Sequence, residues 1–191
     1  HTGSYLIRQE NAESSKGNTI TVASGAHDIT LQRITIEKTG DEECAFSIEN
    51  GATVTLTLEG ENSLQSGRNR AGLHVAENAV LTIKGKNGRN DDNTLVAKCV
   101  DGNTGRNKPT GAAVGGNRYE SSCEAIIIES GTVTAIVEGG STYGAAIGGG
   151  EKGNGGTITI NGGVVTASCN GNTQGAAIGG GSGGNGGTIT I

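Results

Sequence analysis

Arginine and asparagine recur together where the chain is expected to turn, and these residue types suit the binding of an acidic sugar. GRNR at 67–70 precedes the apolar segment 71–75, and GRNK at 105–108 precedes the similar segment 111–116. Arginine forms paired hydrogen bonds with carboxylates and sulfates, and asparagine amides bond hydroxyl groups. The predicted ligand-binding residues are Arg68, Asn69, Arg70, Arg106, Asn107, Arg118 and Tyr119, the last as a stacking platform for a sugar ring.

Alignment of the apolar segments places Arg68 and Arg106 at the same point of successive repeats. Asn69 and Asn107 align in the same way, so we expect each pair to stack on one surface. Loops exposed to water are generally polar, and a solvated loop that binds nothing is the competing interpretation.

Candidate catalytic groups are few. A lyase acting on acidic polysaccharides needs carboxylates that hold Ca²⁺ and a basic residue that accepts a proton. Asp91 and Asp92 next to Arg89 are compatible with this chemistry, and equally with a solvated turn. The other acidic candidates are Glu42, Glu43, Glu49 and Glu77. We therefore predict a non-enzymatic protein without catalytic residues, and keep a polysaccharide lyase-like enzyme as the alternative.

The histidines and cysteines form no recognisable metal motif. His27 and His74 have no partner at a spacing typical of metal ligands, so no metal site is predicted. The calcium-binding nonapeptide pattern is also absent, which leaves weak Ca²⁺ binding at Asp/Asn/Gly corners and no predicted cofactor. The cysteines lie at Cys44, Cys99, Cys123 and Cys169 without a CxxC pair, so buried thiols and one or two disulfides both stay open.

Composition restricts the fold and the partners. Of 191 residues, 36 are glycine and only 2% are aromatic, so small and β-branched side chains must fill a thin core. The net charge of −5, without a basic run, disfavours nucleic acid as a partner. No apolar stretch approaches the roughly 20 residues that cross a bilayer, so no membrane span is predicted.

Regular alternation of side chains identifies the elements that must position these residues. TITI at 157–160 recurs at 188–191, and VVTAS at 164–168 alternates in the same way, as half-buried strands do. The apolar piece GAAIG is a third short strand. NGG at 161–163 and NGN at 170–172 are expected to be tight corners, because Asn and Gly tolerate positive φ. One repeat therefore contains three strands.

The repeat can be followed back through most of the chain. Its third-strand positions are matched at Ile48, Val75, Val114, Ile147 and Ile178. Unequal steps between them indicate insertions at corners. We therefore predict a right-handed parallel β-helix (a β-solenoid) with three short strands per turn and about six turns. The predicted domain covers residues 18–191, and residues 1–17 are expected to be a lead-in at the edge of an expressed fragment.

Outward threonines form a column along the predicted helix, at positions such as Thr55, Thr82, Thr159 and Thr190. Flat threonine ladders bind ice in some β-solenoids. Ile127 and Lys84 interrupt this column, and threonine is in any case a common exposed strand residue, so ice binding is only a minor alternative.

The strings GAAIGGG, GNGGTITINGG and VVTAS, with NGATVTLTLEGENSLQS and AGLHVAENAVLTIKG earlier in the chain, carry a resemblance. They resemble the glycine-rich repeat modules of secreted or cell-wall-anchored Gram-positive bacterial proteins, and are similar to carbohydrate-binding right-handed β-helix proteins. The resemblance spans about residues 18–191. It implies a β-helix on the bacterial surface or outside the cell, and it supplies no catalytic motif.

The sequence thus predicts an adhesin-like module that binds glycan through its corner loops. Its expected partner is an acidic glycan or a host surface protein, and a structural stalk that binds nothing is the other alternative. The last TITI segment has no capping sequence, so we expect truncation at the C-terminus and end-to-end self-association through the open strand edge.

Overall fold

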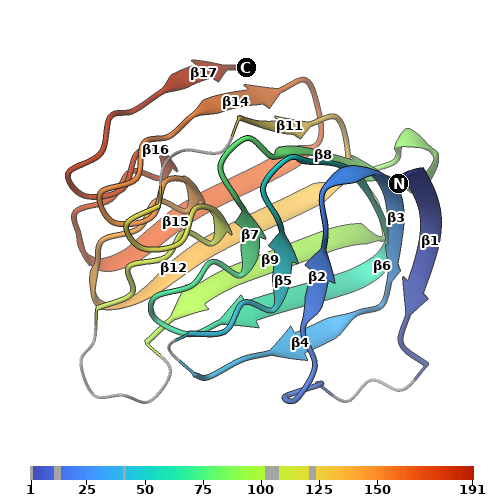
Figure 1. Ribbon diagram of the computed structural model, residues 1–191, viewed down its shortest axis with the longest axis horizontal. Helices are drawn as coiled ribbons and strands as arrows, with labels where there is room; N and C mark the ends of the chain where they lie inside the picture. Colours follow the sequence, from blue (N-terminus) through green and yellow to red (C-terminus); the bar gives the residue numbers. More distant parts are fainter. Residues whose placement is uncertain (1, 11–13, 41, 102–107, 121–123) are drawn as a thin grey trace.

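The protein is built almost entirely from parallel β-strands. The computed structural model describes residues 2–10, 14–40, 42–101, 108–120 and 124–191 (Figure 1). Within these ranges every strand pair is parallel, and the only helical element is a single 3₁₀ turn, η1 (Lys86–Gly88). This confirms the expected all-β class and the parallel arrangement of its strands.

The strands form three ladders. The first contains β1 (Thr2–Arg8), β3 (Gly25–Gln32), the first part of β6 (Ala52–Ser66), β8 (Val80–Gly85), β11 (Ala125–Ile128), β14 (Thr157–Ile160) and β17 (Thr188–Thr190). The second contains β4 (Thr35–Glu37), the second part of β6, β9 (Asn93–Val100), β12 (Thr132–Thr142) and β15 (Val164–Thr173). The third contains β2 (Ile20–Val22), β5 (Phe46–Ile48), β7 (Leu73–Val75), β10 (Val114–Gly115), β13 (Ile147–Gly148) and β16 (Ile178–Gly179).

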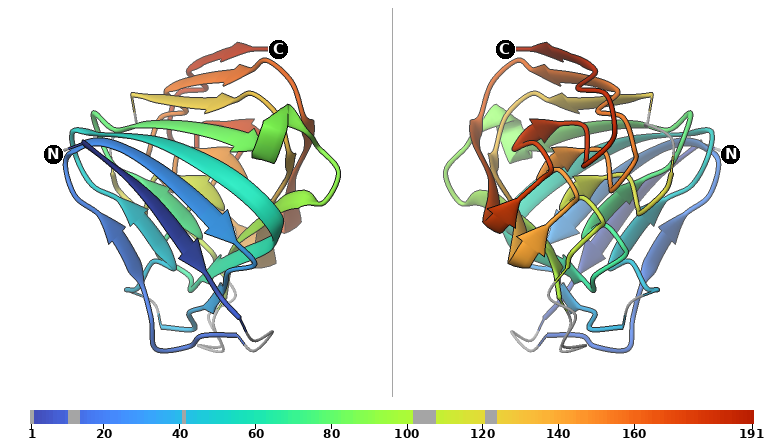
Figure 2. Two further views of the ribbon diagram at one scale, coloured as in Figure 1. Left: turned by 90° about the vertical axis from the view of Figure 1, so that its right-hand side faces the viewer. Right: turned by 90° about the vertical axis from the view of Figure 1, so that its left-hand side faces the viewer.

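Strand β6 joins the first two ladders into one curled eleven-stranded sheet, and the third ladder is a separate six-stranded sheet. The sequence predicts two strands here, at 53–60 and 62–66, but the structure has one continuous strand. Gly60 lies between the two parts with φ +70, which allows the strand to change direction without ending. Figure 2 shows the resulting curl of the sheet from both sides.

The chain visits the three ladders in a constant order, from third to first to second. The predicted register of the third ladder is confirmed for Ile48 with Val75 and for Val114, Ile147 and Ile178 with one another. It is wrong at one step, since Val114 pairs with Leu73 rather than Val75. Both valines and Leu73 face the core, so the hydrophobic pattern alone could not separate two registers that differ by two residues.

The core lies between the ladders and is filled by alternate residues. Val54, Leu56 and Leu58 of β6 are fully buried, and the residues between them are at least partly exposed. Phe46 and all of the fully buried leucines precede residue 130, whereas alanines, valines and isoleucines fill the later repeats. The core side chains are therefore smaller toward the C-terminus.

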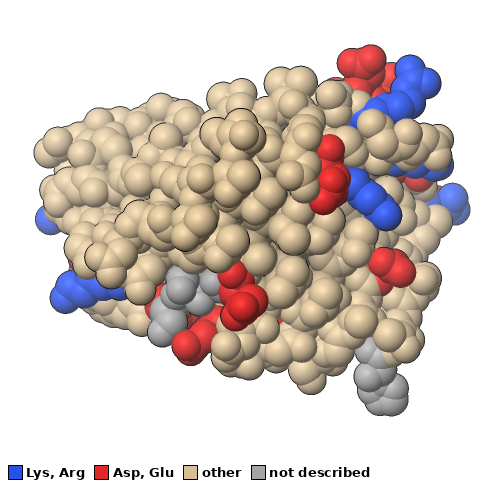
Figure 3. Space-filling view, turned by 90° about the horizontal axis from the view of Figure 1, so that it is seen from above, with Lys and Arg blue, Asp and Glu red and all other residues tan. Residues whose placement is uncertain are grey.

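The outer face of the first ladder carries the expected threonine column. Thr55, Thr82, Ile127, Thr159 and Thr190 pair in successive strands, so Ile127 interrupts the column as predicted. The face viewed in Figure 3 is largely uncharged, and most of its charged side chains lie toward its margins.

Two segments differ in detail from the sequence-based expectation. Residues 170–172, expected to be a corner, lie within β15, which runs to Thr173. Their corner prediction is wrong because β12 continues beside them and supplies a parallel partner, with Glu138 opposite Asn170. At the other end, the expected lead-in contributes β1, which pairs with β3.

Candidate functional site

A polar groove of about 590 Å³ lies along the outer side of the third ladder. Its walls come from the third-ladder strands and from the segments that follow β4, precede β7 and follow β10. We call it the His74 groove, and the residues that matter most on its walls are Glu42, Ser47, Glu49, Arg70, His74 and Glu120.

Strand register places Ser47 beside His74. The two residues are direct partners between β5 and β7, and their neighbours Phe46, Ile48, Leu73 and Val75 point into the core. Ser47 and His74 therefore point outward, into the groove, although each is buried by the segments above it.

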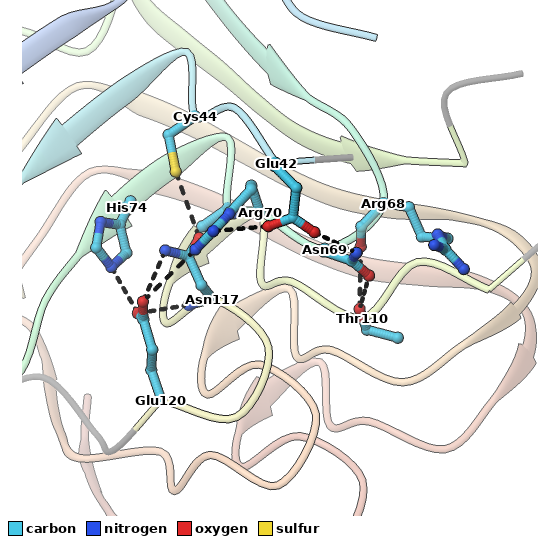
Figure 4. Close-up of polar contacts among 10 residues, drawn as sticks. Glu42, Cys44, Arg68, Asn69, Arg70, His74, Thr110, Asn117 and Glu120 are labelled. Carbon is cyan, nitrogen blue, oxygen red and sulfur yellow. Dashed lines mark hydrogen bonds and ion pairs between the residues drawn. The ribbon is translucent and has the colours of Figure 1, made fainter. Parts of the chain in front are cut away.

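The acidic partner of His74 comes from the segment that follows the next strand. Gly115 of β10 pairs with His74. The chain after β10 turns back over the ladder, and Glu120 reaches the imidazole (Figure 4). Gly115 has φ +133, and a Cβ there would lie 2.0 Å from the Gly148 carbonyl oxygen, so this glycine allows the close packing of β10 on β13.

A chain of hydrogen bonds links four side chains across the groove. The Ser47 hydroxyl donates to Glu49 Oε1 at 2.7 Å, and Ser47 Oγ also lies 2.7 Å from His74 Nδ1. His74 Nε2 lies 2.7 Å from Glu120 Oε2. Each bond is short, and both imidazole nitrogens of the buried His74 have a partner.

Glu120 is held in its charged form. Burial alone raises its pKa, but the hydrogen bond and the charge of His74 together with hydrogen bonds from Asn117 outweigh burial and lower the pKa to about 2. Asn117 donates from Nδ2 to Glu120 Oε1 at 3.0 Å and from its backbone N–H to Oε2 at 3.1 Å. Glu120 is therefore a carboxylate at neutral pH.

Asn117 also fixes the floor of the groove. It is almost fully buried, and its Oδ1 accepts the backbone N–H of Ala71 at 2.8 Å and the Cys44 thiol at 3.4 Å. One amide thus ties the segment after β10 to the segments before β5 and β7, which are otherwise far apart in the sequence.

The described cysteines are free thiols. Cys44, Cys99 and Cys169 form no disulfide, which decides the alternative for these three, and Cys123 lies outside the described residues. Burial raises the pKa of Cys44 and of Cys99 to about 12, although Arg70 opposes the shift at Cys44. Cys44 lines the groove but is protonated at neutral pH, so it is a poor nucleophile.

Two of the predicted residues, Asn69 and Arg70, contact carboxylates. Arg70 pairs with Glu42 at 2.7 Å and lies 3.9 Å from Glu120, and Asn69 donates to Glu42 at 3.0 Å (Figure 4). Arg70 Nε is buried and has no hydrogen-bond partner among the described residues. Among the predicted residues that the structure describes, Arg70 alone lines the His74 groove.

Arg118 and Tyr119 form a separate pair beside the groove. Arg118 Nε donates to Glu151 at 2.8 Å, and its guanidinium lies 4.3 Å from the centre of the Tyr119 ring. Lys152 also lies over this ring, at 5.2 Å. Tyr119 is 57% exposed, but cations already contact the ring that was predicted to stack on a sugar.

The predicted stacking of Arg68 on Arg106 and of Asn69 on Asn107 cannot be followed, because Arg106 and Asn107 lie outside the described residues. In Figure 4 the Arg68 side chain points away from His74 and Glu120. The Arg68 backbone has a structural role, since its carbonyl accepts the N–H groups of Thr110 and Gly111.

The lyase candidates do not gather into a metal site. Asp91 and Asp92 lie with Arg89 beside a different surface hollow near η1, and the Asn93 side chain caps the carbonyls of Arg89 and Asp91. Across the described part of the chain, no three His, Cys, Asp or Glu residues are arranged to hold a metal ion.

Ser47, His74 and Glu120 were not predicted as a group. Ser47 and Glu120 lie 27 and 46 residues from His74 in the sequence, so only the strand register brings them together. Aligning the polar positions of the third strand would have given Thr21, Ser47, His74 and Gly115 on successive steps. These outward-facing positions lie next to the apolar positions that face the core, and their polar residues are the signal in the sequence for this site.

Comparison of the chain with protein-family models, with curated proteins and with solved structures found no match. Among the described residues, no helix has the length and apolar character needed to span a membrane.

Proposed function

We propose that the chain is a right-handed β-solenoid module of a secreted or surface-attached bacterial protein, and that it binds a glycan in the His74 groove. The groove supports this proposal because it combines a hydroxyl, an imidazole, an amide and several carboxylates within one concave surface. Sugar hydroxyls are recognised by such mixed donors and acceptors.

The constant order in which the chain visits its three ladders supports the solenoid. Each visit advances every ladder by one strand, so three strands correspond to one turn. A right-handed path is the one that parallel crossover connections almost always take. Location outside the cell is proposed from the resemblance to secreted repeat modules.

Charge favours a neutral glycan or an amino sugar over the acidic glycan that the arginines suggest. Glu42, Glu43, Glu49 and Glu120 line the groove, and the cations among its described residues are Lys38 and Arg70. Arg70 is paired with Glu42, and Lys38 lies 3.5 Å from Glu43. An incoming carboxylate or sulfate would have to displace these partners and approach unpaired negative charge.

A glycan array with neutral, amino, uronic-acid and sulfated sugars tests this proposal. We expect binding to neutral or amino sugars, and a loss of about tenfold or more in affinity for Glu49→Ala, whose exposed side chain lines the groove. Glu138→Ala, exposed on β12 and outside the groove, is the matched control.

Two other results would reject glycan binding in the groove. Binding that Glu49→Ala leaves unchanged would place the site elsewhere, with the Arg118–Tyr119 surface as the next region to vary. An array without any signal would favour the stalk without a ligand or a host protein partner. Release of unsaturated sugars by the protein that requires a divalent metal ion would instead support the lyase alternative.

A further inference from the structure

The groove contains the three groups that nucleophilic catalysis by serine requires. Such catalysis needs a hydroxyl, a base within hydrogen-bond distance of it, and a third group that orients the base. Ser47 Oγ lies 2.7 Å from His74 Nδ1, and Glu120 Oε2 lies 2.7 Å from His74 Nε2. These contacts come from three separate segments of the chain and converge on one surface hollow.

The contact with Glu120 fixes one hydrogen of His74. The Glu120 carboxylate can only accept, so Nε2 carries the hydrogen of that bond. In the neutral imidazole, Nδ1 then presents its lone pair to the Ser47 hydroxyl. Glu49 Oε1, also 2.7 Å from Ser47 Oγ, is a second acceptor for the same hydrogen. The single hydroxyl of Ser47 is therefore set between two bases.

We propose that the His74 groove hydrolyses O-acyl esters, with Ser47 as the nucleophile, His74 as its general base and Glu120 as a positioning residue. Ser47 Oγ bonds to the acyl carbon and its proton passes to His74 Nδ1. The ester C–O bond breaks, and the leaving alkoxide takes that proton. Water then attacks the acyl-serine through the same base, which releases the carboxylic acid and returns a proton to Ser47 Oγ.

The surroundings of Ser47 suit this reaction. Ser47 lines the groove, and the Thr21 hydroxyl lies on the same wall, one step earlier in the ladder. Cys44 does not compete as a nucleophile, because burial raises its pKa to about 12. That the leaving alcohol is a sugar hydroxyl rests on the proposed glycan binding, whereas attack on a simple ester does not.

Labelling of the whole chain by a fluorophosphonate probe tests the nucleophile without any glycan. We expect one adduct, mapped to Ser47 by peptide mass spectrometry, and hydrolysis of p-nitrophenyl acetate by the same protein. Ser47→Ala should lose both, and His74→Gln should slow both by about 10²-fold, the usual contribution of a general base. Ser168→Ala on β15, outside the groove, is the matched control and should label and hydrolyse like the wild type.

The Glu120→Gln variant tests whether Glu120 positions His74 for catalysis or only stabilises the fold. As a positioning residue it should lower kcat by about 10²-fold with KM unchanged, while circular dichroism shows a folded chain. No adduct on Ser47 in the folded wild type, or labelling no faster than in the urea-unfolded chain, would overturn the proposal. Since the probe carries no sugar, labelling with a blank glycan array would reject only the glycan, and array binding without labelling would reject only the esterase.

Discussion

The corner that follows β10 and the corner that follows β13 begin on adjacent strands in matched register, yet they are built differently. After β10, side chains add to the backbone hydrogen bonds: Asn117 bonds Ala71 and Cys44, and Glu120 bonds His74. After β13, hydrogen bonds between backbone groups predominate, as in Gly149 N–H to the Gly179 carbonyl and Gly155 N–H to the Asn185 carbonyl. The first corner covers a groove, and the second stacks on a copy of itself.

The difference follows from what lies in the neighbouring repeat. The last two repeats have almost the same sequence, so their corners have the same shape and main-chain groups can meet directly. The segments before β5, β7 and β10 differ in sequence, so buried backbone groups such as Ala71 N–H need side-chain partners. Divergence between repeats is therefore what brings polar side chains together and creates a candidate site.

The glycine corner should be the more sensitive of the two to a single methyl group. Gly148 has φ +128, and a Cβ there would lie 2.0 Å from the Gly179 carbonyl oxygen. Both the backbone strain and the clash oppose Gly148→Ala, so we expect a loss of about 3 kcal/mol in the free energy of unfolding. Urea denaturation followed by circular dichroism measures it.

Gly186→Ala is the matched control within the same glycine-rich sequence. No atom lies within 4 Å of a Cβ at this position, so its effect should stay within about 0.5 kcal/mol. Equal losses from the two substitutions would show that glycine is needed for chain flexibility in general, and the stacked-backbone account of this corner would fail.

The side-chain corner should depend on one amide. Asn117→Ala removes the acceptor for the buried Ala71 N–H and the side-chain donor to Glu120 Oε1, and should cost about 2 kcal/mol. Asn161→Ala, which removes a single exposed contact to Glu129, should cost no more than about 0.5 kcal/mol. Thermal unfolding of both variants beside the wild type gives the comparison, and an Asn117→Ala chain as stable as the control would contradict it.

The fold was far easier to predict than the site. Alternation in TITI and VVTAS is a local property, and it located β14, β15 and β17 from a few residues each. Register is less local: pairing Val114 with Val75 or with Leu73 buries the same kind of side chain, so the hydrophobic pattern is nearly indifferent to that choice.

The candidate site depends on the register between β7 and β10, which the hydrophobic pattern does not determine. The observed register sets Gly115 against His74, and the segment that follows β10 then brings Glu120 to the imidazole. Arg70 was predicted because arginine is conspicuous in the sequence, whereas its pairing with Glu42 depends on how two long segments fold over each other. Residue type identifies what a side chain can bind, and long-range packing decides what it does bind.

Glu120 offers the finest test of the side-chain corner, through pH. Its pKa is about 2 in the folded chain against an ordinary 4.5, so the folded state binds the proton more weakly than the unfolded state. The stabilisation from the Glu120 charge is thus complete above pH 4.5 and is lost as the pH falls toward 2. Allowing for partial exposure of the side chain, it amounts to about 1 kcal/mol.

Glu120→Gln should therefore be less stable than wild type at pH 7, and the difference should shrink toward pH 2. Glu138→Gln, exposed on β12, should track the wild type at every pH. A constant gap between Glu120→Gln and wild type across this range would mean that the carboxylate holds His74 by shape and hydrogen bonding alone, without a contribution from its charge.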